Sequence, residues 1–127
     1  MPDTHVKFHS ANGKRLILIV DDELINREIL ANILSEQYEV ITTASGTEAL
    51  RVLQERGDML SLVLLDLLLP DMNGLDILRR IKEDPALSAI PVIVITSDKE
   101  AEVESLTIGA IDFVSKPFPS PKVVMAR

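Results

Sequence analysis

LVLLDLLLPDMNG, residues 62–74, is the stretch of the sequence that carries the most information about the fold. Residues 62–65 form a short apolar run of the kind that builds a buried strand. Asp66 then stands between two apolar runs, where an unpaired charge is costly. Pro70 and Gly74 mark a loop. The stretch therefore predicts a strand that ends at a carboxylate in an apolar setting.

Four further apolar runs recur at regular spacing, and most of them are rich in Val and Ile. We expect them to form strands at residues 16–20, 39–43, 92–95 and 113–114. Helical periodicity predicts helices between the strands, at residues 25–34, from the capping-box residue Ser45 to Gly57, at residues 75–81 and, from a weaker pattern, at residues 99–108. Strands that alternate with helices predict right-handed crossovers and a parallel sheet covered on both faces.

The predicted fold is thus α/β, with a doubly wound five-stranded parallel sheet in a (βα)5 three-layer sandwich. Only about two turns of a fifth helix fit between Pro121 and Arg127. We therefore expect that helix to be truncated and the chain to be cut from a longer multidomain protein. Residues 1–14 are expected to be a polar tail, and residues 15–127 a single domain.

The composition excludes several classes of protein. Lys and Arg number 13 against 20 Asp and Glu, so the net charge is -7, which argues against direct binding of nucleic acid. The absence of Cys excludes disulfide scaffolds, thiol nucleophiles and thiolate zinc sites, and it favours a cytoplasmic location. The longest apolar stretch, residues 62–70, is interrupted by Asp66 and is far shorter than the roughly 18 residues of a membrane span.

Polar residues follow the predicted strands at the edge where open parallel sheets bind ligands. These residues are Asp21, Asp22, Glu23, Asp66, Thr96, Ser97 and Lys116. Carboxylates gathered at one edge repel one another unless a cation relieves the repulsion, and a set of oxygen ligands suits Mg²⁺. A carboxylate beside Mg²⁺ and a Lys is well placed to accept a phosphoryl group.

Each of these residues also has an ordinary structural explanation. Asp21 and Asp22 could cap the helix that follows them. Thr96 is compatible with plain strand propensity, and Lys116 before a proline could be a solvated loop residue. Only the combination points to a function.

The combination resembles the response regulator receiver family, the CheY-like domains of two-component signalling, over residues 15–118. The resemblance rests on ILIVDDE (residues 17–23), LVLLDLLLPDMNG, VIVITS (residues 92–97) and GAIDFVSKPF (residues 109–118), in the order and at the spacing of the family. It implies the flavodoxin-like sandwich that the strand pattern also predicts.

The resemblance also implies a metal and phosphorylation site. Asp66 would be the phosphoacceptor, and Asp22, Asp66 and the backbone carbonyl of Leu68 would bind Mg²⁺ or Mn²⁺ directly. Asp21 would hold the ion partly through water. No other cofactor is expected.

Further positions follow from the same resemblance. Thr96 would donate its hydroxyl to the phosphoryl group, and Lys116 would pair with the phosphoryl oxygens. Phe113 would move inward and change the face formed by the fourth helix, fifth strand and fifth helix. Leu68, Ser97 and Asp98 would modulate the rates.

The expected function is that of a phosphorylation-dependent switch rather than an enzyme. Its partners would be a sensor histidine kinase or phosphotransfer protein and an output module beyond residue 127. The last dozen residues resemble those of regulators whose output makes or degrades a cyclic dinucleotide. A phosphorylation-dependent homodimer and a monomer both stay open, and the short apolar stretches predict no contact with a membrane.

Three alternatives remain at this point. An aspartyl-phosphate phosphohydrolase would need a D-x-D pattern after the first strand, which residues 21–24 do not fit. A degenerate receiver would bind partners without phosphate, but all five expected site side chains are present. A nucleotide-binding protein would need a glycine-rich loop after the first strand, and the sequence has none there.

Overall fold

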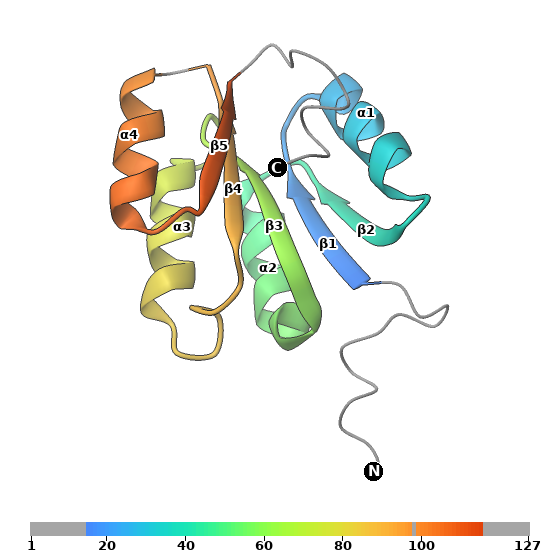
Figure 1. Ribbon diagram of the computed structural model, residues 1–127, viewed down its shortest axis with the longest axis horizontal. Coiled ribbons are helices and arrows are strands. Elements are labelled where there is room, and N and C mark those ends of the chain that lie inside the picture. The colour runs from blue at the N-terminus through green and yellow to red at the C-terminus, as the bar shows by residue number, and fades with distance from the viewer. Residues whose placement is uncertain (1–14, 98, 116–127) are drawn as a thin grey trace.

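One parallel sheet forms the centre of the protein, with strand order β2-β1-β3-β4-β5 (Figure 1). The structure is a computed structural model that describes residues 15–97 and 99–115. The strands are β1 (Arg15–Val20), β2 (Tyr38–Thr43), β3 (Leu60–Asp66), β4 (Val92–Thr96) and β5 (Asp112–Ser115). Each neighbouring pair is parallel, so the predicted α/β class with five parallel strands is confirmed.

Helices cover both faces of the sheet and give the molecule three layers. They are α1 (Leu24–Leu34), α2 (Gly46–Arg56), the short 3-10 helix η2 (Gly57–Met59), α3 (Gly74–Glu83) and α4 (Lys99–Ile108). Figure 1 shows α1 on one side of the sheet and α2, α3 and α4 on the other. The predicted fifth helix and the tail at residues 1–14 lie outside the described residues.

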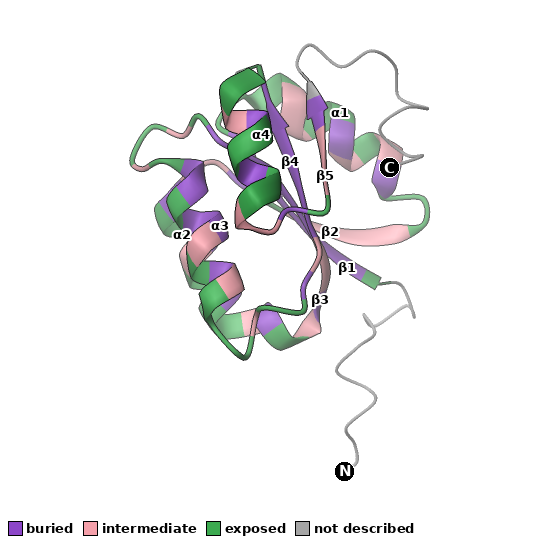
Figure 2. Ribbon diagram, turned by 60° about the vertical axis from the view of Figure 1, so that its left-hand side comes forward, coloured by how far each residue is buried: buried purple, intermediate pink, exposed green. Residues whose placement is uncertain are grey.

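The core is divided by the sheet into two clusters, because successive side chains of a strand point to opposite faces. On β1, Leu16, Leu18 and Val20 pack with residues of α2 and α3, whereas Ile17 and Ile19 pack with residues of α1. Every residue of β1 after the first is buried (Figure 2). Burial on both faces explains why the strands are continuous apolar runs rather than alternating ones.

The beginning of α2 shows the Ser45 half of the predicted capping box, whereas Glu48 reaches one residue beyond the N-cap. The hydroxyl of Ser45 accepts a hydrogen bond from the backbone N–H of Glu48 (3.2 Å). The carboxylate of Glu48 in turn accepts one from the N–H of Ala44 (3.4 Å). These bonds satisfy amides that have no partner within the helix, and they place the start of α2 next to the end of β2.

Candidate functional site

Four carboxylates gather at the carboxyl ends of β1 and β3. Each of them, namely Asp21, Asp22, Glu23 and Asp66, offers one oxygen, and these oxygens all lie within 4.8 Å of one another. We call this group the acidic cluster. It forms because Val20 pairs with Leu65 in neighbouring strands, so the next residue of each strand emerges at the same edge. The predicted convergence of carboxylates is therefore confirmed.

Burial differs within the acidic cluster. Asp21 is 0% exposed and Asp66 is 2% exposed, whereas Asp22 and Glu23 are exposed to solvent. Two buried carboxylates so close together repel each other, and a cation bound beside them would relieve that repulsion. An all-oxygen donor set of this kind fits Mg²⁺ or Mn²⁺, and it does not suit metals that prefer sulfur or imidazole ligands.

Backbone hydrogen bonds fix the turn that carries Asp21. Its carboxylate accepts from the N–H of Glu23 (2.9 Å), and its N–H donates to the carbonyl of Thr43 at the end of β2 (3.1 Å). Its carbonyl accepts from the guanidinium of Arg27 on α1 (2.9 Å). The N-cap position of α1 belongs to Glu23, so helix capping by Asp21 or Asp22 does not explain this pair.

Asp66 is followed at once by a tightly bonded loop, residues 67–73, which we call the β3–α3 loop. The carboxylate of Asp66 accepts from the N–H of Leu68 (3.0 Å), and Leu68 forms an isolated antiparallel bridge with Asn73. The N–H of Gly74 donates to the carbonyl of Leu67 (2.9 Å). The main chain of Leu68, proposed above as a metal ligand, is thereby held next to Asp66.

Gly74 allows α3 to begin directly against this loop. A Cβ at this position would lie 2.5 Å from the Cα of Leu67 and 2.6 Å from the carbonyl oxygen of Asp66. Both obstacles are backbone atoms that a rotamer change cannot move. The glycine therefore sets how closely α3 approaches the end of β3.

Thr96 lies beside the acidic cluster in the sheet. Asp66 pairs with Ile95 of β4, so Thr96 is the next residue toward the same edge, and its side chain is fully buried. Ser97 is exposed directly beyond it. Phe113 on β5 is half-buried against the core cluster on the α2–α3 side. Asp98 and Lys116 lie outside the described residues, so their predicted roles stay predictions.

A groove of about 520 Å³ opens next to these residues, between the β3–α3 loop and α4. Leu68 and Thr96 both line it, together with Glu100 and Glu104 of α4. Leu68 is 60% exposed, so an apolar side chain stands in solvent beside the proposed phosphoacceptor. The groove therefore opens to solvent beside the end of β3.

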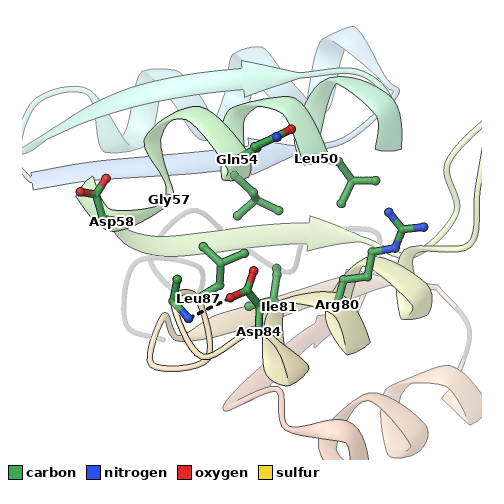
Figure 3. Close-up of a pocket in the computed structure, with 10 residues that line it drawn as sticks. Leu50, Gln54, Gly57, Asp58, Arg80, Ile81, Asp84 and Leu87 are labelled. Carbon is green, nitrogen blue, oxygen red and sulfur yellow. Dashed lines mark hydrogen bonds between the residues drawn. The ribbon is translucent and has the colours of Figure 1, made fainter.

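A second groove, of about 480 Å³, lies between α2 and α3 and is lined by residues such as Leu53, Arg80 and Leu87 (Figure 3). Its lining includes Asp58 and Asp84, which follow the carboxyl ends of the two helices. Those helix ends lie at the edge of the sheet opposite the acidic cluster, because each helix runs antiparallel to its strands. This groove is therefore separate from the candidate site.

Glu23 joins the acidic cluster, as its place directly after the first strand predicted. One residue near the site did not emerge from the sequence as a site residue. Asp71 accepts hydrogen bonds from the start of α2, and these bonds lower its pKa from 3.8 to about 2. The hydroxyl of Thr47 is the largest cause, followed by the N–H groups of Gly46 and Thr47. No local pattern indicates a contact that spans 24 residues.

An open parallel sheet with an acidic cluster at its carboxyl edge, a buried Asp as the last residue of β3 and a buried Thr as the last residue of β4 defines a receiver-type signalling domain. The family pattern described as the response regulator receiver domain matches residues 17–126, and the chain belongs to this family. Members of the family are switches of two-component signalling systems. No described helix is long and apolar enough to cross a membrane.

Curated relatives are similar over most of this chain. The phosphate regulon transcriptional regulatory protein PhoB of Pseudomonas aeruginosa is 36% identical over 116 residues, which are 89% of this chain and 49% of PhoB. A relative from Vibrio cholerae, whose name is that of a cyclic di-GMP phosphodiesterase, is 37% identical over 107 residues, 83% of this chain and 24% of that protein. The chain spans about half or less of the length of these relatives.

Solved structures share the fold. A CheY-like response regulator receiver domain protein from Methanospirillum hungatei JF-1 is 30% identical with a TM-score of 0.80, and the match covers 89% of each chain. The Mn²⁺-bound form of the response regulator Rcp1 is 27% identical with a TM-score of 0.75, covering 88% of this chain and 87% of that one.

Proposed function

We propose that this chain is the phosphoacceptor of a two-component phosphorelay, in which Asp66 takes a phosphoryl group from a phosphohistidine. The observation that carries the proposal is the position of Asp66, a buried carboxylate at the end of a central strand and within 4.8 Å of three further carboxylates. The transfer forms an O–P bond to Asp66 and breaks the N–P bond of the donor. The donor is a sensor histidine kinase or a phosphotransfer protein.

The acidic cluster provides the ligands for Mg²⁺ or Mn²⁺ in this proposal. Asp22, Asp66 and the carbonyl of Leu68 would hold the ion, and Asp21 would hold it partly through water. The chemistry that the ion would supply is neutralisation of the charge on the phosphoryl oxygens. The exposure of Asp22 and Glu23 leaves a path from solvent to the cluster, which a reversible ion and a phosphodonor both need.

Thr96, Lys116 and Phe113 respond to the phosphoryl group after it has been transferred to Asp66. Thr96 directly follows Ile95, the residue of β4 that pairs with Asp66. Its hydroxyl donates to one phosphoryl oxygen, and Lys116 pairs with another. Phe113 then moves inward and alters the face formed by α4, β5 and the helix expected after Pro121. Charge placed at one site thus biases a two-state surface.

Three positions are proposed to set how long the phosphorylated state lasts. Leu68 and Ser97 are exposed next to Asp66 and Thr96, and Asp98 follows directly in the sequence. Side chains at these positions control the access of water to the phosphoryl group.

The switched surface acts on an output module beyond residue 127 or on a second copy of the domain. The relatives named above carry names of a transcriptional regulator and of a cyclic di-GMP phosphodiesterase, and both are longer than this chain. An output that makes or degrades a cyclic dinucleotide is one such module. The domain itself is a switch of the cytoplasm and turns over no substrate besides its own phosphoryl group.

The direct test is intact mass spectrometry after incubation with acetyl phosphate, with Mg²⁺ or with EDTA. We expect one phosphoryl adduct on the wild type in Mg²⁺, and none in EDTA or on Asp66→Asn. A Ser45→Ala variant is a matched control that leaves every carboxylate and the bonds of Asp71 in place and should still form the adduct. Absence of an adduct, under conditions that modify another receiver, would show a phosphate-independent interaction domain instead.

A further inference from the structure

The carboxylate of Asp71 connects the β3–α3 loop to the start of α2. Its two oxygens accept hydrogen bonds from the N–H of Gly46 (2.8 Å), the N–H of Thr47 (2.9 Å) and the hydroxyl of Thr47 (2.5 Å). Asp71 thus caps a helix to which it does not belong, from 24 residues away. A carboxylate at a helix N-terminus is stabilised by unpaired amides and by the helix dipole.

The junction between β2 and α2, residues 43–47, is also bonded to the other side of the acidic cluster. The carbonyl of Thr43 accepts from the N–H of Asp21 (3.1 Å), and the hydroxyl of Thr43 donates to the carbonyl of Ile19 on β1 (3.2 Å). This junction therefore contacts both segments that carry the proposed metal ligands. One segment holds Asp21 and Asp22, and the other is the β3–α3 loop with Leu68.

Packing gives the β3–α3 loop a second contact with the same junction. A Cβ at Gly46 would collide with the side chain of Met72, which shows how closely the loop lies against the start of α2. Leu68, in contrast, is exposed, so its side chain contributes little to fixing the loop. The position of the Leu68 carbonyl therefore depends on hydrogen bonds and on the contacts of Asp71 and Met72.

We propose that Asp71 is a positioning residue of the metal site, which fixes the distance between the Asp21–Asp22 turn and the Leu68 carbonyl through its bonds to α2. This inference rests on the proposed function, because it assigns those groups to the ion. Asp71 does not touch the ion in this arrangement. It acts through Gly46 and Thr47, and residues that orient metal ligands in this way affect affinity strongly.

The test is a titration of the whole chain with Mn²⁺, in which electron paramagnetic resonance reports the free ion. We expect Asp71→Ala to weaken binding by about tenfold. Thr47→Val should weaken it less, and Asp71→Asn, which keeps one acceptor oxygen, should lie between wild type and Asp71→Ala. The matched control is Ser45→Ala, which removes the capping bond to Glu48 within α2 but leaves the bonds of Asp71 intact.

The outcomes separate this inference from the proposed function. If Asp71→Ala binds Mn²⁺ with wild-type affinity, the inference is overturned. It is also overturned if Ser45→Ala weakens Mn²⁺ binding as much as Asp71→Ala does, because a less stable α2 would then explain both results. If Asp71→Ala does not fold, the Mn²⁺ affinities of Asp71→Asn and Thr47→Val are compared with those of wild type and Ser45→Ala instead. A wild type that binds no Mn²⁺, or binding that survives Asp22→Asn, would overturn the metal site itself and the inference with it.

Discussion

Leu68 places an exposed apolar side chain two residues after the proposed phosphoacceptor, in the groove that Thr96 also lines. We expect this side chain to exclude water from the phosphoryl group and to prolong the phosphorylated state. Leu68→Asn should then speed the loss of phosphate several-fold, because an amide can orient an attacking water. Decay of the phosphorylated mass in Mg²⁺ after removal of the donor measures the rate.

The control for this experiment is Ile111→Asn. Ile111 is 59% exposed, against 60% for Leu68, but it precedes β5 and lies at the opposite edge of the sheet. Its substitution should leave the decay rate unchanged. Unchanged or slower decay in Leu68→Asn would contradict the role given to Leu68.

Asp71 predicts a dependence of stability on pH. Its pKa is about 2 in the folded protein against the usual 3.8, so the ionised form stabilises the fold above pH 4. This contribution should fade as the pH falls from about 4 toward 2, where Asp71 becomes protonated in the folded state too. The free energies of unfolding of wild type and Asp71→Asn, measured in urea, should differ by a constant amount above about pH 5. The two values should converge as the pH falls below 5.

Ser45→Ala serves as the comparison, because it removes a capping bond that involves no titrating oxygen on residue 45. The stability lost in Ser45→Ala should be the same at every pH, whereas the stability lost in Asp71→Asn should shrink as the pH falls. A difference between wild type and Asp71→Asn that persists to pH 2 would show that the charge of Asp71 is not the cause.

The site residues divide into those that follow a strand and those that do not. The apolar runs predicted that Asp21, Asp66 and Thr96 lie at the carboxyl edge, because each directly follows or ends such a run, and the structure has them there. They did not indicate Asp71, because this residue bonds to a helix that is distant in the sequence. Contacts across such distances depend on how loops fold back, which local periodicity does not encode.

At Gly74, the start of α3 depends on the absence of a side chain. Gly74→Ala should destabilise the protein by about 1–3 kcal/mol, because the new methyl group would press on the backbone of Asp66 and Leu67. Urea unfolding measures the loss. Gly57→Ala is the comparison, since its methyl group would meet only the flexible side chain of Leu87 and should cost less. Equal losses would show that the close approach of α3 is not the cause.

The element boundaries show what hydrophobic periodicity can and cannot predict. Every strand extends beyond its predicted apolar run, because backbone pairing continues through polar residues such as Arg15 and Asp112. On α1, Leu30 and Leu34 are buried as the apolar stripe indicates, but Ile25 is 71% exposed. Periodicity identified the helix. It did not show that the apolar face of α1 is wider than its contact with the sheet.

The net charge of -7 and the acidic cluster together predict that a divalent ion stabilises the whole fold. An ion that binds only the folded state at a concentration of 100 times its dissociation constant adds about 2.7 kcal/mol. Thermal unfolding in Mg²⁺ should therefore occur at a higher temperature than in EDTA. NaCl at matched ionic strength should not reproduce the shift, and Asp22→Asn should reduce it. An equal shift in NaCl would point to general screening of charge.

The alternation of strands and helices predicted the class of the whole molecule, but not the order of its strands. The chain adds β2 on one side of β1 and then β3 on the other, so the order is β2-β1-β3-β4-β5. This reversal brings the ends of β1 and β3 together and creates the acidic cluster. No single segment of the sequence encodes it, because it depends on which neighbours each strand pairs with.

The strand order also determines how strongly the site resists local unfolding. Asp21, Asp66 and Thr96 follow or end the three inner strands β1, β3 and β4, each of which has a neighbour on both sides. Amide protons in such strands exchange with deuterium mainly when the whole domain unfolds, whereas edge strands and loops exchange through local opening. Asp66 and its closest neighbours in the sheet therefore persist as long as the native state does.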